Sequence, residues 1–274
     1  MRVGRASRAA CSSGQVDRHG RICARREEAD PVVVARSDHG RQDRLRLPGL
    51  LKERVALVHV DLVAPLPIMT EQMRVYSYVV AHDAGFAPNP FHGVCSLACC
   101  KPKIRSQAKV GDIVVGLTTR SERVVYAMRV GEVISFASYW ADARFVAKRP
   151  RRMARAAVDR CGDNIYEPTP EGDFLQLPSA HSNPDGTTNH ALMRRDLSSL
   201  HVLVGERFAY FGGGGPPLPT ELRFLRATRG HRSRFTTEQV TVVARWFEEL
   251  PRGVLAAPGM WPRKDDSWRQ ASSS

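Results

Sequence analysis

The stretch VGDIVVGLTTRSERVVYAMRV, residues 110–130, decides the fold class that the sequence predicts. Both ends of this stretch are rich in β-branched and aromatic residues, which favour strands, and the TTRSE between them is short and turn-like. A Gly-Asp turn leads into the first run. The sequence therefore predicts two antiparallel strands, one over 110–117 and a longer one over 123–136.

Segments on both sides of this pair complete a mixed set of elements. Further strands are predicted over 76–83 and 201–212, and helices over 138–149, 152–162 and 236–250. The last helix has the clearest signal, because Thr236 and Gln239 have the spacing of a capping box. Strands and helices do not alternate as in βαβ units. The predicted fold class is α+β, with a small curled antiparallel or mixed sheet, or a barrel, and flanking helices.

Composition divides the chain into an N-terminal extension and a folded domain. All 20 aromatic residues follow position 72, although an even distribution would place about five of them before it. A segment without aromatic residues buries too little apolar area to offset its chain entropy. We therefore expect residues 1–72 to be disordered or to come from a mis-assigned start upstream of Met73. Residues 73–261 are expected to form the domain and residues 262–274 a flexible tail.

Targeting signals are weak in this sequence. Residues 1–72 are rich in Arg and Ala, like a mitochondrial presequence, but their nine acidic residues argue against one. The sequence has neither the apolar core of a secretory signal nor an apolar run of about 18 residues that would span a membrane. We expect a cytoplasmic protein without a membrane partner.

The net charge of the chain is +13, and residues 73–274 carry +9 of it. A basic domain favours an anionic partner, here nucleic acid or a nucleotide. The plain alternative is a basic protein that has no such partner.

The stretch NPFHGVCSLACCKPKIR (89–105) combines three cysteines, a histidine and three basic residues. The spacing H-x2-C-x3-C-C that begins at His92 supplies only half of a zinc site, so we predict no metal and assign no cofactor. Lys101 and Lys103 favour the reactive thiolate form of Cys100. A buried, inert thiol is the alternative.

Three clusters have the composition of an anion-binding site. Lysines and an arginine alternate in KPKIR, so an extended segment places them on one face. Glycines let the backbone approach a phosphate, and arginines just before a helix gain from its positive end. The predicted phosphate-binding residues are Lys101, Lys103, Arg105, Gly212, Gly213, Gly214, Gly215, Arg232 and Arg234. A solvated surface and a structural corner are the alternatives.

The segment 162–190 is rich in turn residues, and a loop of this length is more often functional than idle. Asp163, Asn164 and His181 supply an acid, an amide and an imidazole there, either for acid–base chemistry or to cap turns. His231 lies among the arginines of RGHRSRF. The candidate catalytic residues are Cys100, Asp163, His181 and His231.

The order of these motifs resembles the second type of nucleotide modification associated domain. The resemblance runs from YSYVVAHDAGFAPNPFHGVCSLACCKPKIR through VGDIVVG, YAMRV, GDNIY and YFGGGGPPLP to GRGHRSRF, over about residues 73–250. It implies a role in bacterial or phage DNA base modification. The motif residues are Asn89, Pro90, Cys95, Cys100, Lys101, Pro102, Arg105, Asp112, Asp163, Asn164, Gly212 to Gly215 and His231. The resemblance thereby adds Asn89 and Asn164 to the nucleotide-binding candidates, whereas Cys99 falls where the family is expected to vary.

Two functions remain open at this point. The first is an enzyme that acts on a base or nucleotide in a bacterial or phage DNA-modification system. The second is a non-catalytic reader of a modified base, because GD-x-VVG followed by YAMRV is also similar, over a shorter length, to PUA-like barrels. We expect CKPKIR, GDNIY, the glycine run and RGHRSRF to converge on one pocket, since clustered cations are unfavourable unless an anion binds between them.

Overall fold

The computed structural model describes residues 73–120, 122–228 and 230–262. The predicted N-terminal extension (1–72) and the predicted tail beyond Pro262 lie outside the described residues.

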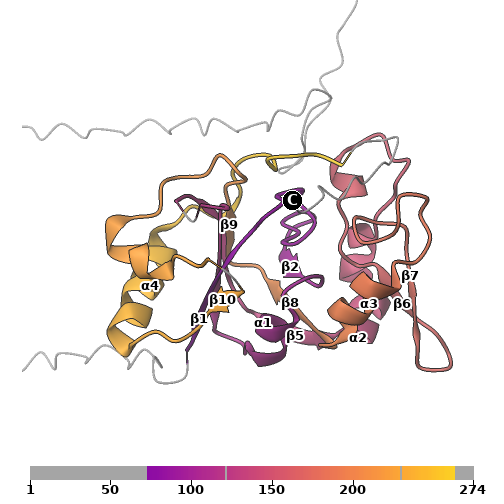
Figure 1. The fold of residues 1–274 in the computed structure, drawn as a ribbon, viewed down its shortest axis with the longest axis horizontal. Coiled ribbons are helices and arrows are strands. Elements are labelled where there is room, and N and C mark those ends of the chain that lie inside the picture. Colours follow the sequence, from indigo (N-terminus) through magenta and orange to yellow (C-terminus); the bar gives the residue numbers. More distant parts are fainter. Residues whose placement is uncertain (1–72, 121, 229, 263–274) are drawn as a thin grey trace, which may run out of the picture. The chain divides into compact units, whose positions relative to one another are not determined.

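Six strands form the larger sheet, in the order β10-β1-β3-β4-β9-β11. Their bounds are β1 Val75–Val79, β3 Ile113–Leu117, β4 Val124–Arg129, β9 Phe208–Tyr210, β10 His231–Arg232 and β11 Gly253–Val254. β3 and β4 pair antiparallel, as predicted, whereas β1 pairs parallel with β3. The prediction of an α+β fold with a small mixed sheet is confirmed (Figure 1). The described strands do not close into a barrel, so the PUA-like alternative gains no support from the fold.

A second sheet of three short strands packs on one face of the first. Its order is β2-β8-β5, with β2 Cys95–Leu97, β5 Glu132–Ser135 and β8 His201–Gly205. One apolar cluster joins the two sheets, with Tyr76 and Tyr126 from the larger sheet and Leu97 and Leu203 from the smaller. The alternation of side chains along each strand sends every second residue into this layer.

Helices cover the outer faces of both sheets. α4 (Thr237–Glu249) lies on the free face of the larger sheet, where Val243 and Phe247 pack with Ile113 and Val115. The predicted capping box of Thr236 and Gln239 starts this helix. On the far side of the smaller sheet lie α2 (Phe136–Ala141) and the hairpin of β6 (Tyr166–Pro168) and β7 (Phe174–Gln176). The layers are therefore α4, the larger sheet, the smaller sheet, and α2 with the hairpin (Figure 1).

The remaining helical elements connect these layers. They are α1 (Pro102–Gln107), α3 (His190–Leu197) and the 3-10 segments η1 (Ala143–Lys148), η2 (Val158–Arg160) and η3 (Thr220–Leu225). α1 and α3 contact each other. None of the helices in the described part of the chain has the length and apolar character needed to cross a bilayer.

Three local predictions were wrong. The strand predicted over 123–136 is divided at Gly131, whose amide donates to the Val204 carbonyl. The two halves of the predicted strand, β4 and β5, belong to different sheets. The helix predicted over 138–149 ends early, because Asp142 caps a new 3-10 turn by accepting from the Arg144 amide.

The helix predicted over 152–162 contains only η2. The guanidinium of Arg160 donates to the carbonyls of Ala154 and Arg155, so these carbonyls bond a side chain rather than a helical amide. The predicted loop 162–190 includes the β6–β7 hairpin.

Candidate active site

Cys100 lies at a strained turn between β2 and α1, where it is half-buried. Cys100 (φ 61°) and Lys101 (φ 42°) both have left-handed backbone conformations, which cost about 1–3 kcal/mol for a residue with a side chain. Two hydrogen bonds hold the turn. Nε of Arg105 donates to the Cys100 carbonyl (2.9 Å), and the Cys100 amide donates to Oδ1 of Asp196 (2.9 Å). Strain of this kind clusters at functional sites.

His181 lies between β7 and α3, and its ring faces the Cys100 thiol. Its Nε2 is 3.4 Å from Sγ of Cys100, and its Nδ1 is 2.5 Å from Oδ2 of Asp196. The backbone of His181 is held on both sides, because its amide donates to Ser179 and its carbonyl accepts from Gln176 (both 3.2 Å). Thiol, imidazole and carboxylate form one hydrogen-bonded chain, which we name the Cys100–His181–Asp196 triad.

Asp196 is fully buried on α3 and connects the parts of the triad. Besides the Cys100 amide and the His181 ring, its carboxylate accepts from the hydroxyl of Tyr166 (2.9 Å). A buried carboxylate needs such donors to offset its desolvation. Asp196 thereby fixes both the orientation of the imidazole and the backbone of the nucleophile candidate.

The charges of the triad follow from burial and these bonds. Burial opposes a charge on His181, but its bonds to Asp196 and Cys100 outweigh this effect and raise the pKa of His181 to about 9. Burial also opposes the charge on Asp196, yet its bonds to His181, Cys100 and Tyr166 keep the pKa of Asp196 below its usual value. At neutral pH the pair is an imidazolium and a carboxylate, so Nδ1 donates to Asp196 and Nε2 donates to the sulfur.

One cationic side chain contacts the sulfur of Cys100, and a second belongs to the next residue in the chain. Nη2 of Arg195 lies 3.8 Å from Sγ, and Nζ of Lys101 lies over the ring of Tyr78, 4.7 Å from its centroid. Burial lowers the pKa of Lys101; a negative charge on Cys100 opposes this shift, and the charge of Arg195 adds to it. Positive charge around a sulfur favours the thiolate, which is its nucleophilic form.

The triad has the parts of a covalent catalyst. A nucleophile lies next to a base, and a third group orients the base. The structure places two candidates from the sequence, Cys100 and His181, in this arrangement.

Cys99, His181 and Asp196 also offer three metal-ligand atoms within 4.8 Å of one another. The Cys99 thiol is buried and donates to the carbonyl of Asp163 (3.6 Å), and burial raises its pKa well above the usual value. A structural zinc site takes four ligands, and a thiol must lose its proton to bind. The Cys99 proton and the hydrogen bond between His181 and Asp196 thus fit a metal ion poorly, and the absence of a metal remains a prediction.

Asp163 lies in the core and not in the triad. It is fully buried and accepts from Ser96 (2.8 Å) and Tyr139 (2.7 Å). Burial raises its pKa, and the charge of the buried Lys148 opposes this shift. The surroundings of Asp163 therefore fit a structural role.

Asn89 and Asn164 are also buried in this region. Oδ1 of Asn89 accepts from Nζ of Lys148 (2.7 Å), and Nδ2 of Asn164 donates to the carbonyl of Tyr139 (3.0 Å). These bonds tie Asn89 to η1 and Asn164 to α2, whereas Oδ1 of the buried Asn164 has no hydrogen-bond partner among the described residues.

Arg105 is fully buried rather than exposed on a basic face. Besides the Cys100 carbonyl, its guanidinium donates to the carbonyls of Asp196, Ser199 (2.9 Å) and His201 (2.6 Å). These carbonyls belong to the last turn of α3, to the link that follows it and to the first residue of β8. Arg105 thus ties the Cys100 turn to α3.

The glycine run forms a tight corner. A Cβ atom on Gly212 (φ 65°) would lie 2.1 Å from the carbonyl oxygen of Ala257, and one on Gly215 would lie 1.9 Å from that of Val124. Backbone approaches this close require glycine. The neighbours of these two glycines are backbone atoms of the fold, which favours the structural alternative.

The RGHRSRF segment sends its side chains to different faces of the larger sheet. His231 is the register partner of Tyr78, and Arg232 is the partner of Ser77. Successive residues of a strand point to opposite faces. His231 therefore shares a face with Tyr78 and Lys101, while Arg232 lies toward α4, with its guanidinium 5.7 Å from the ring of Phe235.

The exposed Arg234 is two residues beyond Arg232, and Lys103 is exposed on α1. Lys103 lies near enough to His231 for its charge to act on the imidazole. The structure thus places Lys101 and His231 on one face of the larger sheet and Arg232 on the other.

Sequence reasoning missed Asp196, Tyr166 and Arg195. Asp196 stands in the polar run MRRDL, where no motif distinguishes it from a solvated acid. The sequence offered Asp163 as the acid beside His181, and no local signal pointed to Asp196 instead.

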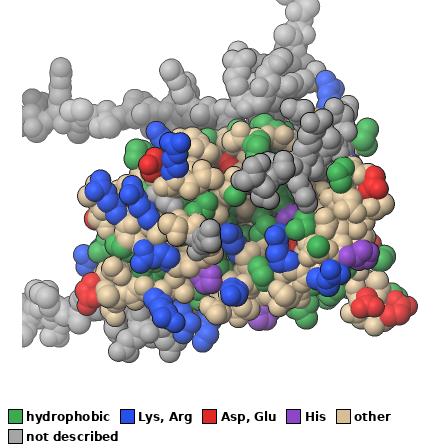
Figure 2. Space-filling view, in the orientation of Figure 1, with side chains coloured by type: hydrophobic (Ala, Val, Ile, Leu, Met, Phe, Trp, Pro, Cys, Tyr) green, Lys and Arg blue, Asp and Glu red, His purple; other side chains and the backbone are tan. Residues whose placement is uncertain are grey.

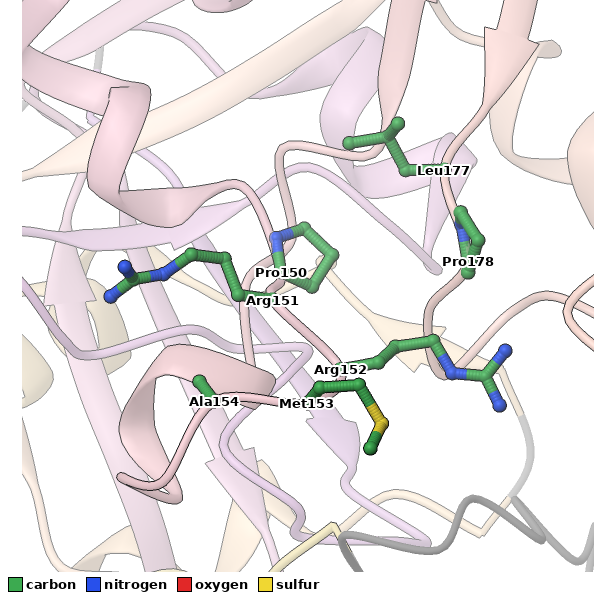
Figure 3. A pocket seen from close by; sticks show the side chains of 7 residues that line it. All are labelled: Pro150, Arg151, Arg152, Met153, Ala154, Leu177 and Pro178. Atoms are coloured by element: carbon green, nitrogen blue, oxygen red, sulfur yellow. The ribbon is translucent and has the colours of Figure 1, made fainter.

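The surface of the domain is basic around this region. Figure 2 shows Lys and Arg side chains scattered over the middle of the face on which α1 and β10 lie. A separate pocket of about 420 Å³ is lined by Pro150, Arg151, Arg152, Met153, Ala154, Leu177 and Pro178, and none of these belongs to the triad (Figure 3).

Comparison with known proteins gives one match. No curated protein and no solved structure matches the chain significantly. The model of a protein family described as nucleotide modification associated domain 2 matches residues 72–265, which is more than half of the chain. The resemblance seen in the motifs is thereby confirmed. The chain belongs to the nucleotide modification associated domain 2 family, and its role is associated with nucleotide modification.

Proposed function

We propose that this protein is a nucleotide-modifying enzyme that works by covalent catalysis at Cys100. The observation that carries the proposal is the hydrogen-bonded chain from the Cys100 thiol through His181 to the buried carboxylate of Asp196. Membership of a family associated with nucleotide modification supports a base or nucleotide as the substrate.

Each member of the triad has a distinct role in this proposal. The sulfur of Cys100 attacks an electrophilic carbon of the substrate, displaces a leaving group and forms a covalent intermediate, which water or a second nucleophile then releases by displacing the sulfur. His181 holds the proton that the thiol has lost and returns it, from Nε2, to the group that departs. Asp196 keeps the ring in the correct orientation and stabilises its charge, as the acid does in other triads.

The surroundings of Cys100 favour an enzyme over a reader. A pocket that only binds a base has no need of a nucleophile with a strained backbone, paired with a charged histidine and flanked by Arg195 and Lys101. A binding pocket is instead characterised by exposed aromatic faces on which a base stacks. Tyr78 and Phe86, whose rings lie beside Lys101 and His181, are buried.

The test is to incubate the full-length protein with deoxynucleotides and with DNA that carries unmodified or modified bases, and to measure intact mass and turnover. A covalent adduct on Cys100 is expected, and Cys100→Ser should remove both adduct and turnover. The matched control is Cys161→Ser, because the Cys161 thiol is buried and donates to the Ala157 carbonyl (3.2 Å), a bond that serine retains. Turnover that persists in Cys100→Ser would refute covalent catalysis.

A further inference from the structure

Tyr78 marks a point where two distant segments bring a lysine and a histidine together. Nζ of Lys101 lies 4.7 Å from the centroid of the Tyr78 ring, and His231 is the partner of Tyr78 in the pairing of β1 with β10. Side chains of directly opposite residues lie on the same face of a sheet. The imidazole of His231, whose centroid is 6.2 Å from that of Tyr76, therefore lies on the same face as the Lys101 ammonium.

The charges of two lysines act on the imidazole of His231. Burial lowers the pKa of His231, and the two charges that act on it, those of Lys103 and Lys101, lower it further. At neutral pH His231 is therefore uncharged, and an anion bound beside Lys101 and Lys103 would neutralise their charges and favour protonation of His231. The half-buried position of Lys101 strengthens the effect, because water screens a partly buried charge less.

We infer that Lys101, Lys103 and His231 form an anion subsite beside Cys100, and that this subsite binds a phosphate group of the substrate. The inference rests on the proposed function and narrows its substrate to a phosphate-bearing nucleotide or strand, as opposed to a free base or nucleoside. Lys101 directly follows Cys100 in the chain, so a phosphate at Lys101 brings the rest of the same nucleotide within reach of the sulfur.

The geometry separates this subsite from the arginines of RGHRSRF. Arg232 pairs in register with Ser77, whose hydroxyl donates to the Leu225 carbonyl on the α4 side of the sheet (2.7 Å). A phosphate bound by Lys101 and His231 lies on the other side. Substitution of Lys101 or His231 should therefore weaken phosphate binding, whereas substitution of Arg232 should not.

Calorimetric titration of the full-length protein tests the subsite directly. The probes are a deoxynucleoside, its 5′-monophosphate, a short single-stranded oligonucleotide and inorganic pyrophosphate. We expect Lys101→Gln and His231→Gln each to weaken binding of the phosphate probes about tenfold, as for the loss of one charge-assisted hydrogen bond. Arg232→Gln and the exposed α4 control Arg245→Gln should bind as the wild type does. Preference for the monophosphate or for the oligonucleotide identifies the source of the phosphate.

Several results would overturn the subsite. These are a nucleoside that binds as tightly as its monophosphate, a Lys101→Gln variant that binds phosphate probes normally, and an Arg232→Gln variant that is impaired as much as Lys101→Gln.

A second readout needs no natural substrate. Iodoacetate is an anion and iodoacetamide is neutral, and both alkylate thiols. The rate with iodoacetate divided by the rate with iodoacetamide should fall severalfold at Cys100 in Lys101→Gln and stay constant in Arg245→Gln. An unchanged ratio in Lys101→Gln contradicts the subsite. Failure of the proposed function looks different, because phosphate binding would remain sensitive to Lys101 while Cys100 proved unreactive.

Discussion

Cys100 and His181 are 81 positions apart in the sequence, and their side chains meet with Sγ and Nε2 3.4 Å apart. Three elements produce this contact. The Cys100 turn is held by Arg105, the His181 segment is held by Gln176, and Asp196 of α3 bonds to both residues. A contact that several elements fix in place is the kind of preorganisation that catalysis requires.

Asp196→Asn should lower the pKa of His181. The wild-type value of about 9 depends on the bond and the charge supplied by Asp196, and without that charge the imidazole should titrate nearer the ordinary value of about 6.5. An NMR titration of the His181 ring measures both values. An Asp196→Asn protein in which His181 still titrates near 9 would show that Asp196 does not control the charge of the ring.

The same bond makes a pH-dependent contribution to stability. The folded-state pKa of His181 is raised above its unfolded value, so the contribution is fully present below about pH 6.5. It is lost as the pH rises through the folded value of about 9. We therefore expect the free energy of unfolding lost in His181→Gln to be largest near pH 6, at roughly 3 kcal/mol, and to shrink by pH 10. Denaturant unfolding at both pH values measures this, and a loss that grows with pH would contradict it.

Asp163→Asn should affect stability and leave the chemistry of Cys100 intact. The variant loses the buried charge that faces Lys148 and weakens the bonds from Ser96 and Tyr139, which should cost about 1–3 kcal/mol of stability. The rate of Cys100 alkylation should stay within about twofold of the wild type. A large loss of Cys100 reactivity with an unchanged melting temperature would instead place Asp163 in the catalytic machinery.

Local signals explain which parts of the fold the sequence predicts. The β3–β4 pair and α4 follow from strand composition, a short turn and a capping box, all of which operate within a few residues. β5 departs from the prediction because its partner, β8, lies about 70 residues further along the chain. The division of the strand at Gly131 depends on that distant pairing.

The site was predictable only in part, for a related reason. Cys100 is followed by lysines and His181 lies in a long loop rich in turn residues, so the sequence alone identifies both as candidates. Burial decides the role of a charged residue, and burial is not visible in the motif. Arg105 looks like part of a basic face in KPKIR but is buried against carbonyls, and Asp196 looks like a solvated acid but is the centre of the triad.

The glycine run offers a matched pair of substitutions. A Cβ on Gly215 would lie 1.9 Å from the Val124 carbonyl oxygen, whereas a Cβ on Gly214 has nothing within 4 Å. Gly215→Ala should therefore lower stability by about 1–3 kcal/mol or more, and Gly214→Ala should leave it nearly unchanged. Thermal unfolding of the two variants tests whether the glycine run is a structural corner. If Gly214→Ala keeps its stability but loses nucleotide binding, the run is a phosphate loop after all.

The most direct test of the account is the reactivity of Cys100 toward iodoacetamide at pH 6, followed by peptide mass spectrometry. An ordinary thiol, with a pKa of about 8.5, is hardly ionised there. Activation by His181 predicts that Cys100 reacts at least about tenfold faster in the wild type than in His181→Gln, a factor that corresponds to about 1.4 kcal/mol. The matched control His190→Gln changes an exposed histidine and should react as the wild type does. Equal rates in the wild type and His181→Gln would contradict a nucleophile activated by this histidine.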